Sequence, residues 1–227
     1  MSTQNSNIND RARESALKAK QMPASVQYAI VQVLPNILNG AFWGFTDIRD
    51  IQDHVEELRK DKNITARKLG NACLLEVNPQ YLLKAVKVID PNALNQKDMQ
   101  VMNESVTKAA MEFEKFLIRK GKKGFAGTIG IYCINDVTTI SYKGVSYPAF
   151  RLSMDTALNI LARYGYTIQV GGNFITPQQA AQAGQALWDS TQLSPTKTGV
   201  FITVKSTLPE DKLKSLEAEF KSRYGLK

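Results

Sequence analysis

Apolar residues recur every three or four positions through most of the first half of the chain, and this spacing predicts a series of amphipathic helices. The expected helices cover residues 23–40, 47–60, 64–76, 79–89 and 96–120. Thr46 is the expected N-cap of the second helix, and Asn78-Pro79 is a typical start for the fourth. Gly121 and Gly124 follow the longest helix and are expected to end it.

After residue 124 the pattern changes to segments rich in β-branched and aromatic residues, which favour strands. Two hairpins are expected, one over 125–147 with its turn at Asn135-Asp136 and one over 166–175 with its turn at Gly171-Gly172. Further helices should cover 151–164, 176–188 and the residues from about 208, with a strand at 199–205. Two capping boxes should start helices: Thr176 with Gln179, and Thr207 with Glu210.

These elements predict an α+β protein that is mainly helical. A flexible N-terminal arm (residues 1–22) should precede a helical lobe (23–124), and a smaller mixed lobe (125–227) should contain short antiparallel hairpins and a C-terminal helix. The boundary between the lobes is expected within 120–127. A single core with the same order of elements is an alternative.

Composition indicates a folded protein that favours anionic partners. The chain has 227 residues, of which 43% are hydrophobic and 22% charged, and its formal net charge is +8. The N-terminal residues lack the apolar centre of a secretory signal, and no apolar run approaches the length of a membrane span. We therefore expect a protein of the cytoplasm of a host cell, or of a virion, that is neither secreted nor bound to membrane.

Catalytic motifs are not evident in the sequence. His54 is the single histidine, and Cys73 and Cys133 both lie in apolar runs without an adjacent histidine. No glycine-rich phosphate loop or paired metal-ligand spacing is present. The sequence predicts no catalytic residue, no metal site and no cofactor, and therefore a protein that is not an enzyme.

The most concentrated charge in the chain follows the longest predicted helix. Lys115, Arg119, Lys120, Lys122 and Lys123 place five cations in nine residues with no acid among them. Cations near a helix C-terminus are stabilised by the helix dipole, which explains Arg119 and Lys120 without any ligand. Lys122 and Lys123 lie beyond the helix in a glycine-flanked loop, which suits the phosphate oxygens of a nucleic acid.

Other residues are candidates for the same surface. The additional cations are Arg59, Lys60, Arg67 and Lys68. Phe125, Tyr132 and Trp43 are the aromatic residues that could stack on bases, although strand aromatics are more often buried in the core. Since no sequence-reading motif is present, we expect contacts to the sugar-phosphate backbone of single strands rather than sequence-specific reading of a duplex.

Two segments are expected to mediate self-association. One is the N-terminal arm, and the other is the C-terminal helix, whose apolar stripe contains Leu213, Leu216 and Phe220. The alternative for this stripe is packing on its own domain. The sequence Arg-Tyr-Gly also ends two predicted helices, at 163–165 and 223–225, as expected for glycine C-caps or for a duplicated unit.

The order of arm, helical lobe, basic crossover and second lobe resembles the general layout of viral nucleocapsid and coat proteins. This analogy implies no residue roles. The function it favours is a self-assembling, nucleocapsid-like protein of a virus or phage that coats single-stranded RNA or DNA without sequence specificity. Two alternatives are a capsid, tail or shell subunit that does not contact nucleic acid, and an enzyme acting on an anionic substrate.

Overall fold

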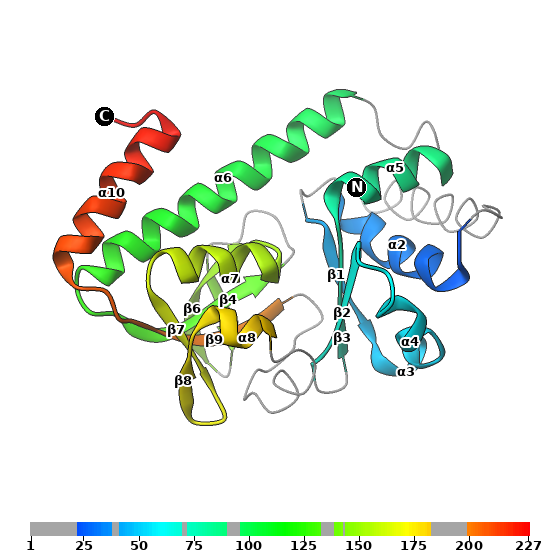
Figure 1. Ribbon diagram of the computed structural model, residues 1–227, viewed down its shortest axis with the longest axis horizontal. Coiled ribbons are helices and arrows are strands. Elements are labelled where there is room, and N and C mark those ends of the chain that lie inside the picture. The colour runs from blue at the N-terminus through cyan, green and yellow to red at the C-terminus, as the bar shows by residue number, and fades with distance from the viewer. Residues whose placement is uncertain are drawn as a thin grey trace. The chain divides into compact units, whose positions relative to one another are not determined.

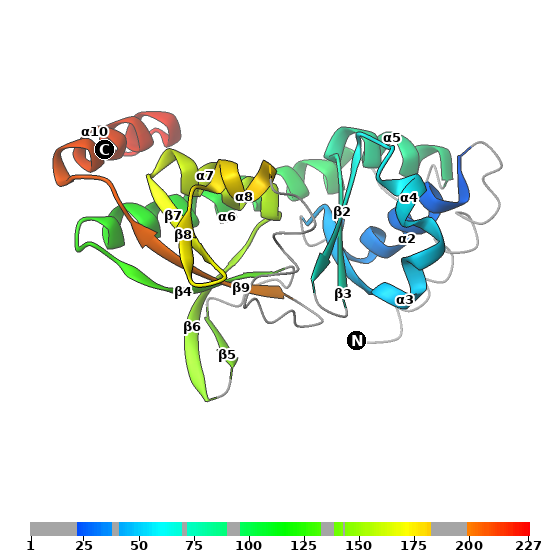
Figure 2. The same cartoon turned by 60° about the horizontal axis from the view of Figure 1, so that its bottom comes forward.

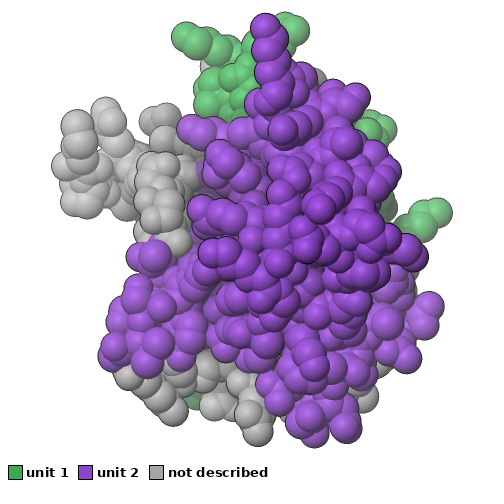
Figure 3. All heavy atoms as spheres, turned by 90° about the vertical axis from the view of Figure 1, so that its left-hand side faces the viewer, with its two compact units in different colours: residues 1–105 green, residues 106–227 purple. Residues whose placement is uncertain are grey.

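The computed structural model describes residues 22–37, 41–69, 72–89, 96–132, 139–142, 144–182 and 199–227. The chain divides into two compact units, residues 1–105 (unit 1) and 106–227 (unit 2), coloured separately in Figure 3. The division falls inside the long helix α6 (Gln96–Gly121), whereas the sequence suggested a boundary within 120–127. The predicted arm lies outside the described residues except for Met22.

Unit 1 is built from a small antiparallel sheet and several helices (Figure 1). Its elements are α2 (Ala24–Ile37), β1 (Trp43–Asp47), α3 (Ile48–Ile51), the 3-10 turn η1 (Gln52–His54), α4 (Val55–Leu58), β2 (Ile64–Leu69), β3 (Ala72–Val77) and α5 (Pro79–Ile89). The strands have the order β1-β3-β2, with both neighbours antiparallel to β3. Ile30 and Val33 of α2 are buried, as are Leu74 and Leu75 of β3.

The prediction of a helical N-terminal lobe is wrong, although the chain is α+β. Residues 64–76, expected to be a helix, form most of β2 and β3, which pair from Ile64↔Val77 to Leu69↔Ala72. Residues 73–77 of the central strand are all buried. A strand that is covered on both faces has a continuous apolar run, and periodicity alone cannot distinguish such a run from a buried helix. Unit 2, expected to be the smaller lobe, is the longer of the two.

Local capping signals in unit 1 had mixed outcomes. The predicted start of α5 is confirmed, because the Asn78 side-chain oxygen accepts hydrogen bonds from the backbone N–H groups of Gln80 (3.0 Å) and Tyr81 (3.4 Å). The expected helix over 47–60 is instead interrupted by the 3-10 turn η1. Its N-cap is Asp47 rather than Thr46, since the Asp47 carboxylate accepts from the backbone N–H of Arg49 at 2.9 Å.

Unit 2 combines the rest of α6 with a six-stranded sheet. Its other elements are β4 (Ala126–Tyr132), β5 (Thr139–Tyr142), β6 (Val145–Arg151), α7 (Met154–Arg163), β7 (Tyr166–Val170), β8 (Asn173–Ile175), α8 (Pro177–Gln182), β9 (Gly199–Ser206) and α10 (Glu210–Tyr224). The strand order is β5-β6-β4-β9-β7-β8. All neighbours are antiparallel except β4 and β6, which run parallel.

The pairing of β4 differs from the sequence prediction. We expected 125–134 to form a hairpin with the segment after Asn135-Asp136, a turn that lies outside the described residues. Instead, β4 lies between β6 and β9, and the hairpin partner of β5 is β6, with Tyr142 opposite Val145. Strand β9 follows β4 by some seventy residues, as the Thr128–Thr203 pair shows, so local turn chemistry carries no information about this contact.

Several local predictions for unit 2 are confirmed. Helix α6 ends at Gly121, α7 is followed by the left-handed Gly165, and β7 and β8 form the expected hairpin. The Thr176 capping box is complete: Gln179 N–H donates to Thr176 Oγ1 (3.1 Å), and Thr176 N–H donates to Gln179 Oε1 (2.9 Å). The rest of the helix expected to reach residue 188 lies outside the described residues after Gln182.

The second capping box is absent. The N-cap residue of α10 is Pro209, and the Thr207 hydroxyl donates instead to the carbonyl oxygen of Gly165 at 2.6 Å. The backbone N–H of Thr207 donates to the same carbonyl at 2.9 Å. Thr207 therefore joins the end of α7 to the start of α10 instead of capping a helix.

The described helices of unit 2 cover one face of its sheet. In Figure 2, α6, α7, α8 and α10 all lie on the same side of β4, β7 and β9. Tyr166 of β7 donates its hydroxyl proton to the Leu117 carbonyl oxygen of α6 at 2.8 Å, which joins the sheet to the helix within the buried layer. The core lies in this layer, where Phe113, Ile129 and Ile202 are almost fully buried.

Candidate nucleic-acid interface

The predicted cation cluster lies at the C-terminal end of α6 and in the turn that follows. Lys115, Arg119, Lys122 and Lys123 are exposed, and Lys120 is half-buried. Positions 115 and 119 are four residues apart, so they share one face of the helix. The other face of this segment is apolar and buried through Phe116, Leu117 and Ile118. The amphipathic pattern of α6 therefore directs Lys115 and Arg119 away from the core.

Lys120 differs from its neighbours because it packs against aromatic rings. Its Nζ lies 5.9 Å from the centroid of the Phe116 ring and 5.5 Å from that of Phe125. The two rings meet edge to face with centroids 5.7 Å apart. A cation over ring faces gains electrostatic stabilisation without any ligand, so Lys120 and Phe125 have a structural role in this arrangement.

Lys122 forms an ion pair with the C-terminal helix. Its Nζ lies 2.5 Å from Glu217 Oε2, and both side chains are about one-third exposed. The hydrogen bond from Lys122 lowers the pKa of the Glu217 carboxyl from its ordinary value. Next to it, the apolar Leu213 packs against Gly121, where an added Cβ would come within 3.1 Å of the leucine methyl. One cation of the cluster is thus neutralised by the molecule itself.

The four other predicted cations belong to unit 1, and one of them is buried. Lys60 and Lys68 are exposed, whereas Arg67 is buried in β2. Arg59 donates to Glu56 Oε1 at 3.4 Å on the same short helical segment. Of these four predicted cations, Arg59, Lys60 and Lys68 are therefore exposed, and Arg67 is not.

The three predicted stacking residues have different environments. Trp43 is buried in the core of unit 1, where it meets Phe45 edge to face with ring centroids 5.4 Å apart. Phe125 is half-buried beneath Lys120, and Tyr132 belongs to β4 with a side chain outside the described set. Burial removes Trp43 as a stacking residue because its ring faces have no access to a base.

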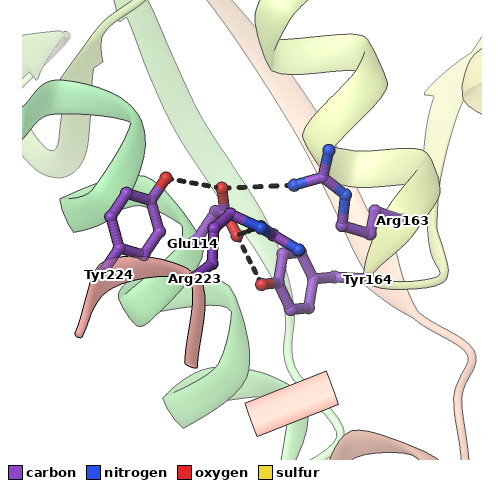
Figure 4. A network of polar contacts seen from close by, with 5 residues as sticks. All are labelled: Glu114, Arg163, Tyr164, Arg223 and Tyr224. Carbon is purple, nitrogen blue, oxygen red and sulfur yellow. Dashed lines mark hydrogen bonds and ion pairs between the residues drawn. The ribbon is translucent and has the colours of Figure 1, made fainter. Parts of the chain in front are cut away.

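A buried polar cluster that the sequence analysis did not identify lies beside the basic segment. Glu114 of α6 is only 2% exposed and accepts four hydrogen bonds (Figure 4). Its Oε1 accepts from Arg163 Nη1 (3.3 Å) and Tyr224 Oη (3.0 Å). Its Oε2 accepts from Tyr164 Oη (2.5 Å) and Arg223 Nη1 (2.7 Å). One carboxylate thus binds an arginine and a tyrosine from the end of α7 and another such pair from the end of α10.

This cluster gives the repeated Arg-Tyr-Gly sequence a physical role. In both copies, a left-handed glycine, Gly165 or Gly225, follows the Arg-Tyr pair and ends the helix. Burial and the hydrogen bond to Glu114 raise the pKa of Tyr164, so its hydroxyl keeps its proton and donates. With four donors around two oxygens, Glu114 has no free acceptor site for a substrate, and the cluster holds three helices together. The repeated Arg-Tyr-Gly was the sequence signal from which this cluster could have been identified.

In the part of the chain that the structure describes, the other residues with catalytic potential show no activated arrangement, and Cys133 lies outside that part. The His54 ring packs 5.7 Å from the ring of Tyr28, and burial raises the pKa of Cys73 to about 11. Within the described ranges, no group of three or more His, Cys, Asp or Glu side chains is placed to hold a metal ion. The described helices include none that is both long and apolar enough to cross a membrane.

Comparison with known proteins adds no assignment: no family model matches the chain, and neither a curated protein nor a solved structure does.

Proposed function

We propose that the protein coats single-stranded RNA or DNA as a self-associating, nucleocapsid-like protein of a virus or phage, and that the cations at the end of α6 bind the phosphate backbone. The observation that supports this function is the exposure of Lys115, Arg119 and Lys123 in unit 2. Among the described residues, none of these three has an ion-pair partner. Like charges on one surface repel one another, and this repulsion falls when a phosphate chain approaches.

Lys120 and Lys122 contribute less to this binding. Lys120 is stabilised by the rings of Phe116 and Phe125, and Lys122 by Glu217. Backbone contacts of this kind carry no sequence information, so binding is non-specific and strongly salt-dependent. RNA and DNA share the phosphate backbone, so both polymers are part of the proposal.

The test neutralises three cations without changing helix length. The variant Lys115→Gln/Arg119→Gln/Lys123→Gln is compared with a control of equal charge change at exposed lysines elsewhere, Lys84→Gln/Lys97→Gln/Lys227→Gln. Binding of fluorescent poly(U) and poly(dT) is measured by anisotropy over a salt series. Each phosphate that the protein no longer neutralises reduces the slope of log K against log salt by about 0.7, so the slope of the site variant should be smaller by about 2.

The control separates local contacts from net charge. If the control variant loses as much affinity and slope as the site variant, then bulk charge explains the binding and the α6 site is wrong. If the wild-type protein binds neither polymer, the proposed function is wrong.

Self-association is measured on the same samples by light scattering, with and without polymer. Particles that grow on polymer support coating. Large particles that form without nucleic acid, from a protein that binds neither polymer, favour the alternative of a shell subunit.

A further inference from the structure

The sheet of unit 2 has a face that its described helices do not cover. Side chains alternate along each strand, and residues such as Ile129 and Ile202 point toward the helices and are fully buried. Their neighbours point to the opposite face, which Figure 2 shows on the side away from α6, α7 and α8. We call the following residues the open face: Thr128 of β4, Thr203 and Lys205 of β9, Thr167 and Gln169 of β7, and Phe174 of β8.

The strand register places these side chains next to one another. Thr128 is opposite Thr203, and their hydroxyl oxygens are 2.9 Å apart. Thr167 is opposite Lys205, and in the adjacent pair of strands Gln169 is opposite Phe174. The open face therefore extends across four neighbouring strands, a width of about 15 Å at the usual strand spacing. Lys205 and Phe174 are its exposed residues, and the other four are half-buried.

An aromatic ring and a cation dominate one end of this face. Phe174 is 42% exposed and is one of the few large apolar side chains on the described surface. Lys205 reaches across β7, so that its Nζ lies 5.8 Å from the centroid of the Phe174 ring. The exposed part of the phenylalanine ring is apolar surface in contact with water, which is unfavourable. A ligand with a flat apolar surface would bury this part of the ring and remove the cost.

The charge of the sheet indicates which ligand this face suits. The six strands contain no aspartate or glutamate, and their charged residues are Arg151 and Lys205 alone. Gln169 lies opposite Phe174 and adds a neutral hydrogen-bonding group beside the ring, whereas the threonine hydroxyls are hydrogen-bonded within the sheet. A nucleotide needs a ring face for its base, a cation for its phosphate and polar groups for its sugar, with no acid to repel it.

We propose that the open face is a base-stacking surface for single-stranded nucleic acid, in which Phe174 stacks on a base and Lys205 contacts the adjacent phosphate. This inference rests on the proposed function, because it adds a second contact region for the same ligand. It differs from the α6 cluster in the type of contact: α6 supplies charge alone, whereas Phe174 supplies a contact that salt does not screen. The two regions therefore have separable signatures.

The first experiment replaces the ring in the full-length protein. Phe174→Ala should weaken binding of poly(U) or poly(dT) about ten-fold, the typical effect of removing one stacked base. The slope of log K against log salt should stay unchanged, because the variant neutralises as many phosphates as the wild type. Leu226→Ala is the matched control, since Leu226 is 44% exposed and distant in sequence from the open face. The circular dichroism spectrum of both variants should equal that of the wild type.

The second experiment detects stacking directly. Phe174→Trp keeps a flat ring at the same place, so affinity should be retained, and saturating poly(dT) should quench the added tryptophan fluorescence. Unchanged affinity in Phe174→Ala, or an added tryptophan that is not quenched, overturns this inference while the α6 test still decides the proposed function. Failure of the wild-type protein to bind either polymer refutes both. If this face instead binds a protein strand at the edge strand β8, Phe174→Ala should leave the affinity for both polymers unchanged.

Discussion

Replacement of Glu114 by glutamine should loosen the C-terminal helix. The substitution keeps the size of the side chain and removes its charge. It also places an NH2 group where two donors now point, so at least one donor pair loses its acceptor. The affected groups are Arg163, Tyr164, Arg223 and Tyr224, all hydrogen-bonded to the carboxylate. Helix α10 carries two of them, Arg223 and Tyr224.

The expected loss of stability follows from the exposure of each donor. Tyr164 is fully buried, so its hydroxyl cannot bind water when the new NH2 group occupies the position of Oε2, and this costs about 2 kcal/mol. The side chains of Arg163 and Arg223 are 42% and 37% exposed, so water replaces part of their interaction and their joint contribution is about 1 kcal/mol. Glu114→Gln should therefore reduce the free energy of unfolding by about 3 kcal/mol.

Urea denaturation followed by circular dichroism measures the loss, and amide hydrogen exchange locates it. Exchange should accelerate most in α10, because Arg223 and Tyr224 hold its last turn. Glu112→Gln, an exposed change of the same type two residues earlier on α6, should alter neither measurement. A loss below about 1 kcal/mol in Glu114→Gln, or unchanged exchange in α10, would refute the view that this cluster holds the helix.

Three further outcomes are expected. Lys122 lowers the pKa of Glu217, so this pair stabilises the protein above the ordinary carboxyl pKa; the advantage of wild type over Glu217→Gln in urea should disappear as pH falls through the lowered value. Burial raises the pKa of Tyr164, so stability should decline as pH rises above about 10, where the unfolded tyrosine ionises, and Tyr164→Phe should reduce that decline in alkaline unfolding curves. Gly225→Ala should reduce the free energy of unfolding by about 1 kcal/mol, because φ is +63° and the space around the added Cβ is open. Gly165→Ala should reduce it clearly more, since its Cβ would lie 2.1 Å from Leu208 Cγ. Equal losses in thermal unfolding would contradict this difference.

The sequence predicted the elements whose signals are local. The Asn78 cap, the Thr176–Gln179 box and the long α6 all depend on residues within a few positions of one another. Strand β3 was missed because burial on both faces gives it the apolar run of a buried helix. The partners of β4 could not be predicted from its hairpin pattern, since pairing with β9 depends on packing over a long stretch of chain.

In the candidate site, too, the features that depend on neighbouring residues were predictable from the sequence, and those that depend on residues far apart in the chain were not. Exposure of Lys115 and Arg119 was predictable from their place on an amphipathic helix. The partner of Lys122 is 95 residues away, and Glu114 meets Arg223 across 109 residues. A lone acid on the apolar face of α6 and a repeated Arg-Tyr-Gly were both visible in the sequence, but nothing local connects them.

The ion pair between Lys122 and Glu217 constrains how a phosphate chain could bind at the end of α6. Helix α10 is held in place by Leu213 and Phe220, which are buried, so the Glu217 carboxylate stays close to Lys122 at a high effective concentration. A phosphate that approaches Lys122 shares the ammonium charge with this carboxylate, so it gains less there than at a cation without an ion-pair partner. In the proposed binding, the net attraction would therefore come from Lys115, Arg119 and Lys123, and α10 would limit the contribution of Lys122.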